Sequence, residues 1–393
     1  MTGAQADFTC SYCLRSKLGS EKSDEHIWPQ SLGGDPLGAP WRTMNVCQRC
    51  NSLAGQFVDA AFVKSMIGLF ERASGVEEYL DPTAPEKTVV PYVHMGTADH
   101  EELKQDEVAD IWVGPAGSVV IHIRPKHDDI WNTYAGGKPT RKRSESGHAY
   151  LGFRSGDPFW AAATFWSFQR QFKTAYRTLL NADTPKVEPA LTPLDANDPE
   201  QARHVRIARS FDGGIKAHAV ISIDNGSRLL AKVALGLGRE TLGDGYLQTP
   251  YAQHLSKALW TRDLDERAKI PVRGASFNAT DDSPLAQAPI AWPGGWLLLL
   301  MLSDGRPSLT VFSPSGKVAT ILVSDSVISD GQHPHWSRDG EVFLVIPAIN
   351  ETAGPISLPD YLAFVLNELD HQILKSLKAR RRDISTLPPK HEA

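Results

Sequence analysis

Four cysteines form two pairs whose spacing is typical of zinc knuckles. Cys10 and Cys13 make the first Cys-x-x-Cys pair, Cys47 and Cys50 make the second, and the other 343 positions (393 minus the first 50) hold none. The thiolates of such a pair can face one point while the backbone between them turns, so two pairs supply the four ligands of a tetrahedral zinc ion. A redox dithiol is the alternative, but two pairs without any other cysteine favour structural zinc. Four sulfurs leave no open position for a reacting water, so any catalysis must come from other residues.

The residues around these pairs resemble the HNH endonuclease family. The family's motif elements occur here in the family's order: Glu25-His26, Pro29, Leu32-Gly33-Gly34, Asn45 and Cys47-Gln48-Arg49-Cys50-Asn51, followed by Gly55 and Asp59. The resemblance extends over about residues 8–70, and it is specific because several fixed elements match together. Asn51 stands where many members have His, which makes this an H-N-N variant. Trp28 departs from the small aliphatic residue that is usual at its position.

The resemblance implies a ββα-metal core with residue roles that can be carried over. His26, on the hairpin, would be the general base that takes a proton from the attacking water, because an imidazole with a pKa of roughly 6.5 is mostly neutral at pH 7. Asn45 would fix the loop and orient His26 by hydrogen bonding. Glu25 and Asn51 would hold the catalytic metal ion. Their oxygens are hard ligands, so we expect Mg²⁺ or Mn²⁺ there and structural Zn²⁺ at the cysteines.

By this resemblance the chain is expected to be a metal-dependent endonuclease that hydrolyses DNA phosphodiester bonds and nicks one strand per active site. A role in restriction or phage defence follows by analogy alone. The alternative is a non-catalytic zinc-knuckle module that binds DNA or protein. Glu25, His26 and Asn51 together favour the nuclease, because a binding module needs no base beside two oxygen ligands.

Each of these residues also has a structural interpretation. A histidine beside a tryptophan is, taken alone, more often a surface or half-buried residue than a base. Taken alone, Asn45 and Asn51 are typical of a turn and of a helix N-cap, and Asn51 could cap the helix as well as bind the metal ion. For Asp59 we expect a salt bridge or hydrogen bond that orients the helix rather than a catalytic role.

Composition limits the kinds of partner that the chain can bind. The net charge is −5, from 41 Lys+Arg against 46 Asp+Glu, so contacts with DNA must be local. The basic run Lys138–Arg143 could supply such contacts or could be a solvated loop. The first residues resemble no secretory signal, and the longest apolar run, Trp296–Leu302, is far shorter than the roughly 20 residues of a membrane span. We therefore expect a cytoplasmic protein without membrane association, which could form homo-oligomers or bind a protein partner.

The pattern of apolar residues predicts an α+β fold with several regions. Residues 1–75 form the nuclease unit and end in a helix over 52–70, and the proline-containing and acidic stretch 76–110 is expected to be a linker. An α+β region over 111–273, possible as a DNA-binding or regulatory domain, is expected to hold a strand at 118–124 and helices at 159–180 and 227–237.

Short apolar runs separated by turns predict an antiparallel β meander in the region 284–393. The expected strands span residues 296–302, 308–312, 318–323 and 341–346. A terminal helix is expected over 358–377, and a basic tail follows it. Nothing in these later regions indicates a chemistry of its own.

Overall fold

The computed structural model describes residues 7–79, 92–114, 119–127, 134–135, 147–152, 176–179, 197–211, 224–277 and 290–381. The chain divides into two compact units. Unit 1 combines Met1–Glu71 with Ile221–Arg380, and unit 2 consists of Arg72–Val220 with Arg381–Ala393. The predicted region 111–273 is therefore split, because its last part packs with the N-terminal segment in one hydrophobic core.

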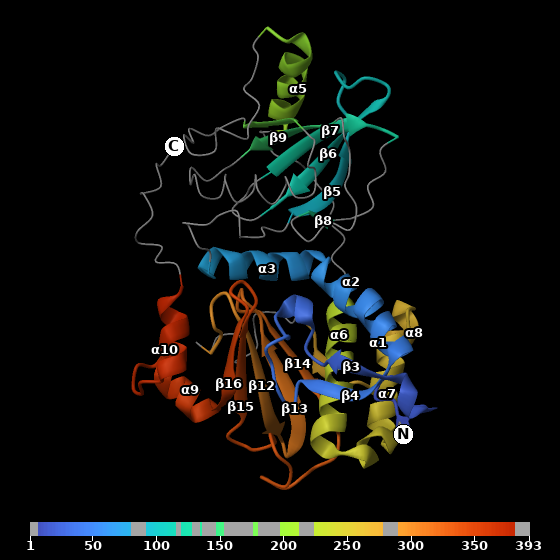
Figure 1. The fold of residues 1–393 in the computed structure, drawn as a ribbon, viewed down its shortest axis with the longest axis vertical. Helices are drawn as coiled ribbons and strands as arrows, with labels where there is room; N and C mark the ends of the chain where they lie inside the picture. The colour runs from blue at the N-terminus through green and yellow to red at the C-terminus, as the bar shows by residue number, and fades with distance from the viewer. Residues whose placement is uncertain are drawn as a thin grey trace, which may run out of the picture. The chain divides into compact units, whose positions relative to one another are not determined.

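A six-stranded antiparallel sheet forms the frame of unit 1, in the order β11-β14-β13-β12-β15-β16 (Figure 1). Its strands are β11 (Gly274–Ala275), β12 (Trp296–Ser303), β13 (Arg306–Phe312), β14 (Val318–Leu322), β15 (Glu341–Ile346) and β16 (Glu351–Ser357). The continuous apolar run of β12 is buried along most of its length, as suits a strand with neighbours on both sides. Asp304 and Gly305 both have positive φ and make the tight turn between β12 and β13. The four predicted strands of the meander are confirmed, whereas the short β11 and the β16 strand were not predicted.

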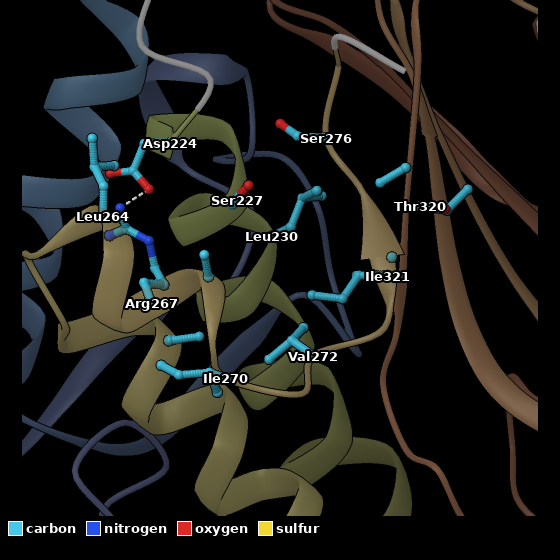
Figure 2. Close-up of a pocket in the computed structure, with 14 residues that line it drawn as sticks. Asp224, Ser227, Leu230, Leu264, Arg267, Ile270, Val272, Ser276, Thr320 and Ile321 are labelled. Atoms are coloured by element: carbon cyan, nitrogen blue, oxygen red, sulfur yellow. Dashed lines mark ion pairs between the residues drawn. The ribbon is translucent and has the colours of Figure 1, made fainter. Parts of the chain in front are cut away.

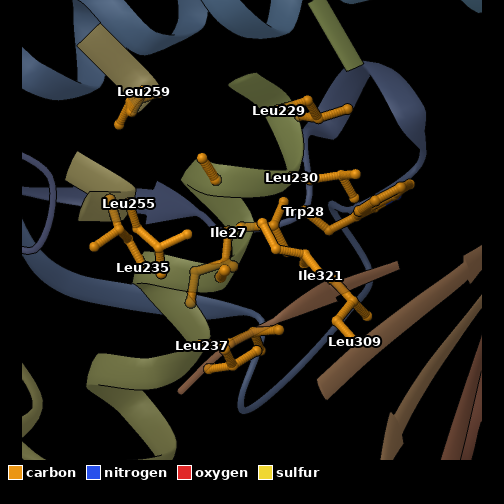
Figure 3. Close-up of a cluster of buried hydrophobic side chains, with 14 of the residues drawn as sticks. Ile27, Trp28, Leu229, Leu230, Leu235, Leu237, Leu255, Leu259, Leu309 and Ile321 are labelled. Carbon is orange, nitrogen blue, oxygen red and sulfur yellow. The ribbon is translucent and has the colours of Figure 1, made fainter. Parts of the chain in front are cut away.

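Two helices pack between this sheet and the N-terminal segment. The first, α6 (Asp224–Leu242), contains the predicted helix 227–237, and α7 (Pro250–Trp260) begins at Thr249, whose side chain accepts a hydrogen bond from the Ala252 amide. The core cluster in Figure 3 joins Ile27 and Trp28 to leucines of both helices and to β13 and β14. Trp28 also lies edge-on to Trp296, with ring centroids 5.4 Å apart. The residues that follow His26 are thus embedded in the core of unit 1.

The N-terminal segment is built from two small hairpins and a bent helical stretch. Strands β1 (Phe8–Thr9) and β2 (Ser16–Lys17) form the first hairpin, and β3 (Lys22–His26) and β4 (Arg42–Cys47) form the second. The helix predicted over 52–70 is divided into α1 (Gln48–Ala54), a π-helical turn η3 (Gly55–Asp59), α2 (Ala60–Val63) and α3 (Met66–Tyr79). Within the described residues no single helix is long and apolar enough to cross a membrane. Only the pair Gln48–Val63 and Met66–Tyr79, bent by 67°, meets that test of length and composition.

The end of unit 1 holds two short helices where one was predicted over 358–377. They are α9 (Leu358–Val365), capped by Ser357, and α10 (Gln372–Ala379), capped by His371. Asn367 has a φ of 61°, a left-handed conformation that ends a helix. The predicted single helix is therefore interrupted at this position.

Unit 2 is built on a second six-stranded sheet, with the order β10-β9-β7-β6-β5-β8. Its strands are β5 (Tyr92–Ala98), β6 (Glu107–Val113), β7 (Val119–Pro125), β8 (Tyr134–Ala135), β9 (His148–Gly152) and β10 (Tyr176–Leu179). Apolar residues of β6, β7 and β9 pack against α5 (Pro199–Ser210), which Asp198 caps.

Several predictions concern this second unit. The predicted strand at 118–124 is confirmed as β7. The linker predicted over 76–110 instead contains β5 and part of β6, which pair with each other as ordered sheet. Residues 80–91 of this stretch lie outside the described part of the chain. The helix predicted over 159–180 is wrong at its end, where β10 pairs with β9, and its residues 159–175 lie outside the described part of the chain. The basic run Lys138–Arg143 also lies outside the described residues.

The contact between α6 and Ile27 can be tested at Gly236. A Cβ atom at this position would lie 2.7 Å from Ile27 Cγ1, and Ile27 is fully buried. Gly236→Val should therefore lower the free energy of unfolding by about 1–3 kcal/mol through overpacking, although valine itself suits a helix at least as well as glycine. Urea unfolding measures the effect. Gly245→Val, at a position with open space, is the control, and equal losses in the two variants would contradict close packing at Gly236.

Candidate functional site

The four cysteines come together at one end of the second hairpin. Cys10 and Cys13 lie in the turn between β1 and β2, Cys47 ends β4, and Cys50 lies in the first turns of α1. Their Sγ atoms all lie within 4.8 Å of one another, and none forms a disulfide. Tetrahedral zinc with Zn–S bonds of about 2.3 Å needs sulfurs about 3.8 Å apart, so this donor set fits that ion. The prediction that the two pairs meet is therefore confirmed.

Crowding of these thiols makes their ionised forms unfavourable unless a cation is bound beside them. The neighbouring Cys10 and Cys13 thiols, together with burial, raise the pKa of Cys50 far above its ordinary value. Several thiolates this close repel one another, and a bound metal ion removes that repulsion. The cysteine cluster thus serves to hold the hairpin and α1 together once a metal ion is bound.

His26 ends β3 and contacts a loop that folds back over it. Its Nε2 lies 3.4 Å from Asp35 Oδ1 and 3.3 Å from the Gln30 amide nitrogen, and that amide donates to Asp35 Oδ1 at 3.0 Å. The side chain is 12% exposed. Both of these polar contacts involve Nε2. A proton on Nε2 would be held by Asp35, which leaves Nδ1 unprotonated and able to accept a proton from water.

The two glycines of the Leu32-Gly33-Gly34 motif allow this loop to return. Gly33 has a φ of 87°, a left-handed conformation that favours glycine. A Cβ atom on Gly34 would lie 2.0 Å from the Trp28 carbonyl oxygen, so the chain can pass there only without a side chain. The amides of both glycines donate to backbone carbonyls of the preceding turn, Gly33 to Gln30 and Gly34 to Pro29. The motif therefore places Asp35 next to His26.

Glu25 points to the opposite side of β3 and joins a buried charge cluster. Its Oε1 lies 2.8 Å from Lys232 Nζ of α6 and accepts a hydrogen bond from the Tyr12 hydroxyl at 2.9 Å. The same ammonium lies 2.8 Å from Asp59 Oδ2 and donates to the His26 carbonyl at 3.1 Å. Lys232 and Tyr12 are fully buried and Glu25 is 5% exposed. One ammonium from α6 thus binds two acidic residues of the HNH-like segment and the backbone of His26.

Burial and the neighbouring charged groups determine which side chains of this cluster are charged. Burial lowers the pKa of Lys232, but the Asp59 and Glu25 carboxylates outweigh burial and raise it above its usual value, so Lys232 stays charged. Burial raises the pKa of Asp59, whose Oδ1 has no hydrogen-bond partner. Burial and Glu25 raise the pKa of Tyr12 well above its usual value, so its hydroxyl remains a donor.

The two asparagines contact other groups than the resemblance implied. The Asn45 amide donates to Glu240 of α6 at 3.2 Å, and Asn45 does not contact the His26 ring. The Asn51 amide donates to the Asp24 carbonyl at 2.9 Å and to Ser23 Oγ at 3.2 Å. Asn51 therefore fixes the backbone of the strand that ends at His26, whereas Asn45 ties β4 to α6.

These contacts bear on the magnesium site expected at Glu25 and Asn51. The Glu25 carboxylate is already neutralised by Lys232 in a closed interior, and the Asn51 amide is bonded to the backbone of β3. In the described residues neither Glu25 nor Asp59 belongs to a group of three side chains able to surround a metal ion. Placed in this way, Glu25 and Asn51 do not fit a shared magnesium ion.

Sequence reasoning missed three partners of the motif residues. Asp35 directly follows the Gly-Gly pair, so its place in the same loop was a local signal. Lys232 was a single charge inside an apolar helical run, which indicates a buried partner. Glu240, which accepts hydrogen bonds from Thr43 and Asn45, left no signal in the sequence. The salt bridge expected for Asp59 is present, and its partner is Lys232.

A second group of possible metal ligands lies in unit 2. Glu107, Glu200 and His204 have ligand atoms within 4.8 Å of one another. Arg203, however, bonds to both carboxylates, at 2.7 Å to Glu107 and 2.6 Å to Glu200. Burial raises the pKa of Glu107, but Arg203 outweighs it and lowers that pKa to about 2. The group is an ion-pair network that fastens α5 to β6, and it offers no free site.

Replacement of Lys232 tests the buried cluster. Lys232→Met leaves the buried Glu25 carboxylate and the 15% exposed Asp59 carboxylate without a counter-charge and should lower the free energy of unfolding by roughly 3–5 kcal/mol at pH 7. Buried unpaired carboxylates have raised pKa values in the folded state, so the loss should shrink as the pH falls and they become protonated. Chemical denaturation at several pH values measures both effects. Lys269→Met, at an exposed lysine paired with Glu266, is the control, and an equal loss in it would contradict the role of Lys232.

The comparisons with known proteins agree with the motif and concern only this segment. Residues 10–67 match the family model described as HNH endonuclease. No curated protein and no solved structure matches the chain. The matched range contains both cysteine pairs, His26 with its loop, and the helical stretch as far as Ile67. The N-terminal region of this chain is therefore an HNH endonuclease domain.

Proposed function

We propose that this chain is an endonuclease that hydrolyses DNA phosphodiester bonds, cutting one strand at each active site. The HNH domain suggests nuclease activity. The observation that carries the proposal is the contact between His26 Nε2 and Asp35, because it orients the one imidazole of the motif. A carboxylate behind a histidine fixes the tautomer and stabilises the imidazolium that forms when the ring takes a proton.

The reaction we propose uses Nδ1 of His26 as the general base. Nδ1 accepts a proton from a water molecule while the water oxygen attacks phosphorus. The bond between phosphorus and the 3′ oxygen breaks, and the 3′ oxygen leaves with the bonding electron pair and takes a proton from solvent to become a hydroxyl. Asp35 holds the Nε2 proton throughout this step. Arg42 lies opposite His26 in the strand pair and is exposed, so its guanidinium can approach a phosphate oxygen. In the free protein Asp24 neutralises Arg42.

Two metal ions were expected, and the two donor sets differ. The four sulfurs fit zinc, and we propose that zinc holds the knuckles and does no chemistry. HNH domains typically use metal ions, and a divalent ion would supply positive charge at the phosphate when bound. Glu25 and Asn51 as placed do not fit such an ion, so the proton transfer that we propose depends on His26 and Asp35.

A second candidate function is a non-catalytic zinc module that binds DNA or protein. The observation that favours it is the closed cluster around Lys232, which occupies the acidic residues expected to bind the catalytic metal ion. A role in restriction or phage defence, a cytoplasmic location and assembly into homo-oligomers are further hypotheses that extend beyond these contacts.

Nicking of supercoiled plasmid DNA discriminates between the two functions. The intact chain should nick DNA, and His26→Ala should lower the rate by about 10²–10⁴-fold because the base is lost. Asp35→Asn should lower the rate by a smaller factor, because the ring is retained but its proton is less well held. Asp370→Asn, at an exposed aspartate paired with Lys375, is the matched control.

The same assay is run with magnesium, with manganese and with a chelator, on modified and unmodified DNA. Activity that requires magnesium or manganese would support the metal-dependent reaction of the family. If wild type and His26→Ala nick at equal rates, or if neither nicks under any condition, the assignment of His26 fails. The binding-module function would then be the better account of the domain.

Elemental analysis tests the structural metal. The purified chain should hold about one zinc ion, and Cys47→Ser with Cys50→Ser should remove it and unfold the N-terminal segment, since binding of structural zinc is coupled to folding. Ser16→Ala, at an exposed serine in β2, is the control. A chain that is folded and free of zinc, or that carries another metal instead, would contradict the proposal.

A further inference from the structure

A hollow of about 580 Å³ lies beside the cysteine cluster in unit 1. One wall comes from the knuckles and α1, and the other comes from α7 and the residue that follows it. The walls are fixed to each other because Ser256 Oγ and Trp260 Nε1 of α7 both donate to the Tyr12 carbonyl, at 2.8 Å and 2.9 Å. Tyr12 lies inside the first Cys-x-x-Cys pair, so any metal ion held there also fixes this hollow.

Cations line the hollow on both sides. Arg15, Lys17 and Arg49 come from the knuckle side and Lys257 from α7, and no acidic residue is among the described residues that line it. Lys17 is paired with Glu21 at 3.1 Å. The other three are exposed and have no ion-pair partner in the part of the chain that the structure describes. In a chain with a net charge of −5, three unpaired cations around one concave surface are a local exception.

Another hollow of unit 1 has its positive charge neutralised by an ion pair. It has a volume of about 370 Å³ and lies between α6, α8 (Leu264–Ala268) and β14. Figure 2 shows its buried arginine, Arg267, directed at Asp224, with which it forms an ion pair. The remaining lining is largely apolar, as with Leu230 and Ile321. Arg267 is neutralised by Asp224. In the described residues, Arg15, Arg49 and Lys257 of the hollow beside the cysteines have no such ion-pair partner.

Cations near four thiolates could simply balance the negative charge of a zinc–sulfur centre. That explanation covers Arg15 and Arg49, which lie within two residues of a cysteine in the sequence. It covers Lys257 less well, because this lysine belongs to α7, outside the segment that matches the HNH family. The side chains of Gln253 and Ser256 add polar groups to the same wall. This composition of arginine, lysine and neutral polar groups is typical of a surface that contacts phosphates.

We propose that this hollow, formed by Arg15, Arg49 and Lys257 around the cysteine cluster, binds the phosphate backbone of duplex DNA and positions it for the site at His26. The proposal rests on the proposed function. Phosphates are the ligand because the cations are exposed and spread over two walls, so that a polymer of regularly spaced charges can bridge them.

The position of the hollow relative to His26 follows from the hairpin. Arg42 of β4 lies opposite His26, and Cys47, which lines the hollow, ends the same strand. Five residues of strand at about 3.4 Å each separate the two, or about 17 Å. One strand of B-DNA advances about 3.4 Å per phosphate, so for a duplex whose axis runs along β4 the contact would lie about five base pairs from the bond that is cut.

Binding is measured with the full chain carrying His26→Ala, so that the DNA is not cut. A labelled duplex is titrated by fluorescence anisotropy over a range of salt concentrations. Relative to this parent, Arg15→Gln, Arg49→Gln and Lys257→Gln together should weaken binding by about tenfold or more, and the slope of log K against log salt should fall by about 0.9 for each lost contact. Lys269→Gln is the matched control at an exposed lysine of the same unit. Lys257→Gln alone should lower the affinity for the duplex, while the zinc content of this variant stays equal to that of the parent.

The outcomes separate this proposal from the nuclease proposal. An unchanged affinity and salt slope in the triple variant would overturn the DNA contact, and so would weaker binding that only follows a loss of zinc. Displacement of the duplex by inorganic phosphate at equal ionic strength would show a site for free anions instead. If the hollow binds DNA but the wild-type chain never cuts it, the nuclease proposal fails and the DNA contact stands. If the chain cuts DNA and the triple variant binds DNA normally, the DNA contact at this hollow fails and the nuclease proposal stands.

Discussion

A single buried ammonium fixes the relation between the HNH domain and the rest of unit 1. Lys232 lies between Glu25 and Asp59 and donates to the carbonyl of His26, with no exposure to solvent. Without this cation the buried Glu25 carboxylate and the largely enclosed Asp59 carboxylate would repel each other and carry a large desolvation cost. The strand that ends at His26, the π-helical turn that ends at Asp59 and helix α6 must therefore adopt one arrangement together.

The cysteine cluster imposes a second constraint at the other end of the same hairpin. Cys47 faces Lys22, at the start of β3, while the ion-pair cluster lies near its end. Between them the short strand pair is held at both ends, which limits how far His26 can move relative to the loop that carries Asp35. The loop in turn depends on Gly34, where no side chain fits. The role of base that we propose for His26 requires such positioning, since misplacement by about 1 Å can cost a factor of about 100 in rate.

Local patterns in the sequence predicted the parts of the site that are close in sequence. The spacing of the cysteines predicted their cluster, and alternating apolar runs with turns predicted the strands from Trp296 to Ile346. The contacts of Glu25 and Asn45 could not be read in this way, because their partners Lys232 and Glu240 lie about 200 positions away on another element. The domain boundaries failed for the same reason: unit 1 is made of two segments that are distant in sequence and share one core. Periodicity reports which face of an element is buried, and it does not report which element covers it.

The discontinuity of unit 1 also sets the timing of its folding during synthesis. His26 and the cysteines are made first, but the lysine that neutralises Glu25 and Asp59 follows 206 positions after His26. At about 5–20 residues per second, a ribosome needs roughly 10–40 s to bridge that gap. During this interval the HNH domain lacks its counter-charge and the core that covers Ile27 and Trp28. A nascent chain thus contains the HNH motif well before α6 is available to complete the fold around it. A truncated product that ends before α6 would contain both cysteine pairs but would lack the core that α6 completes.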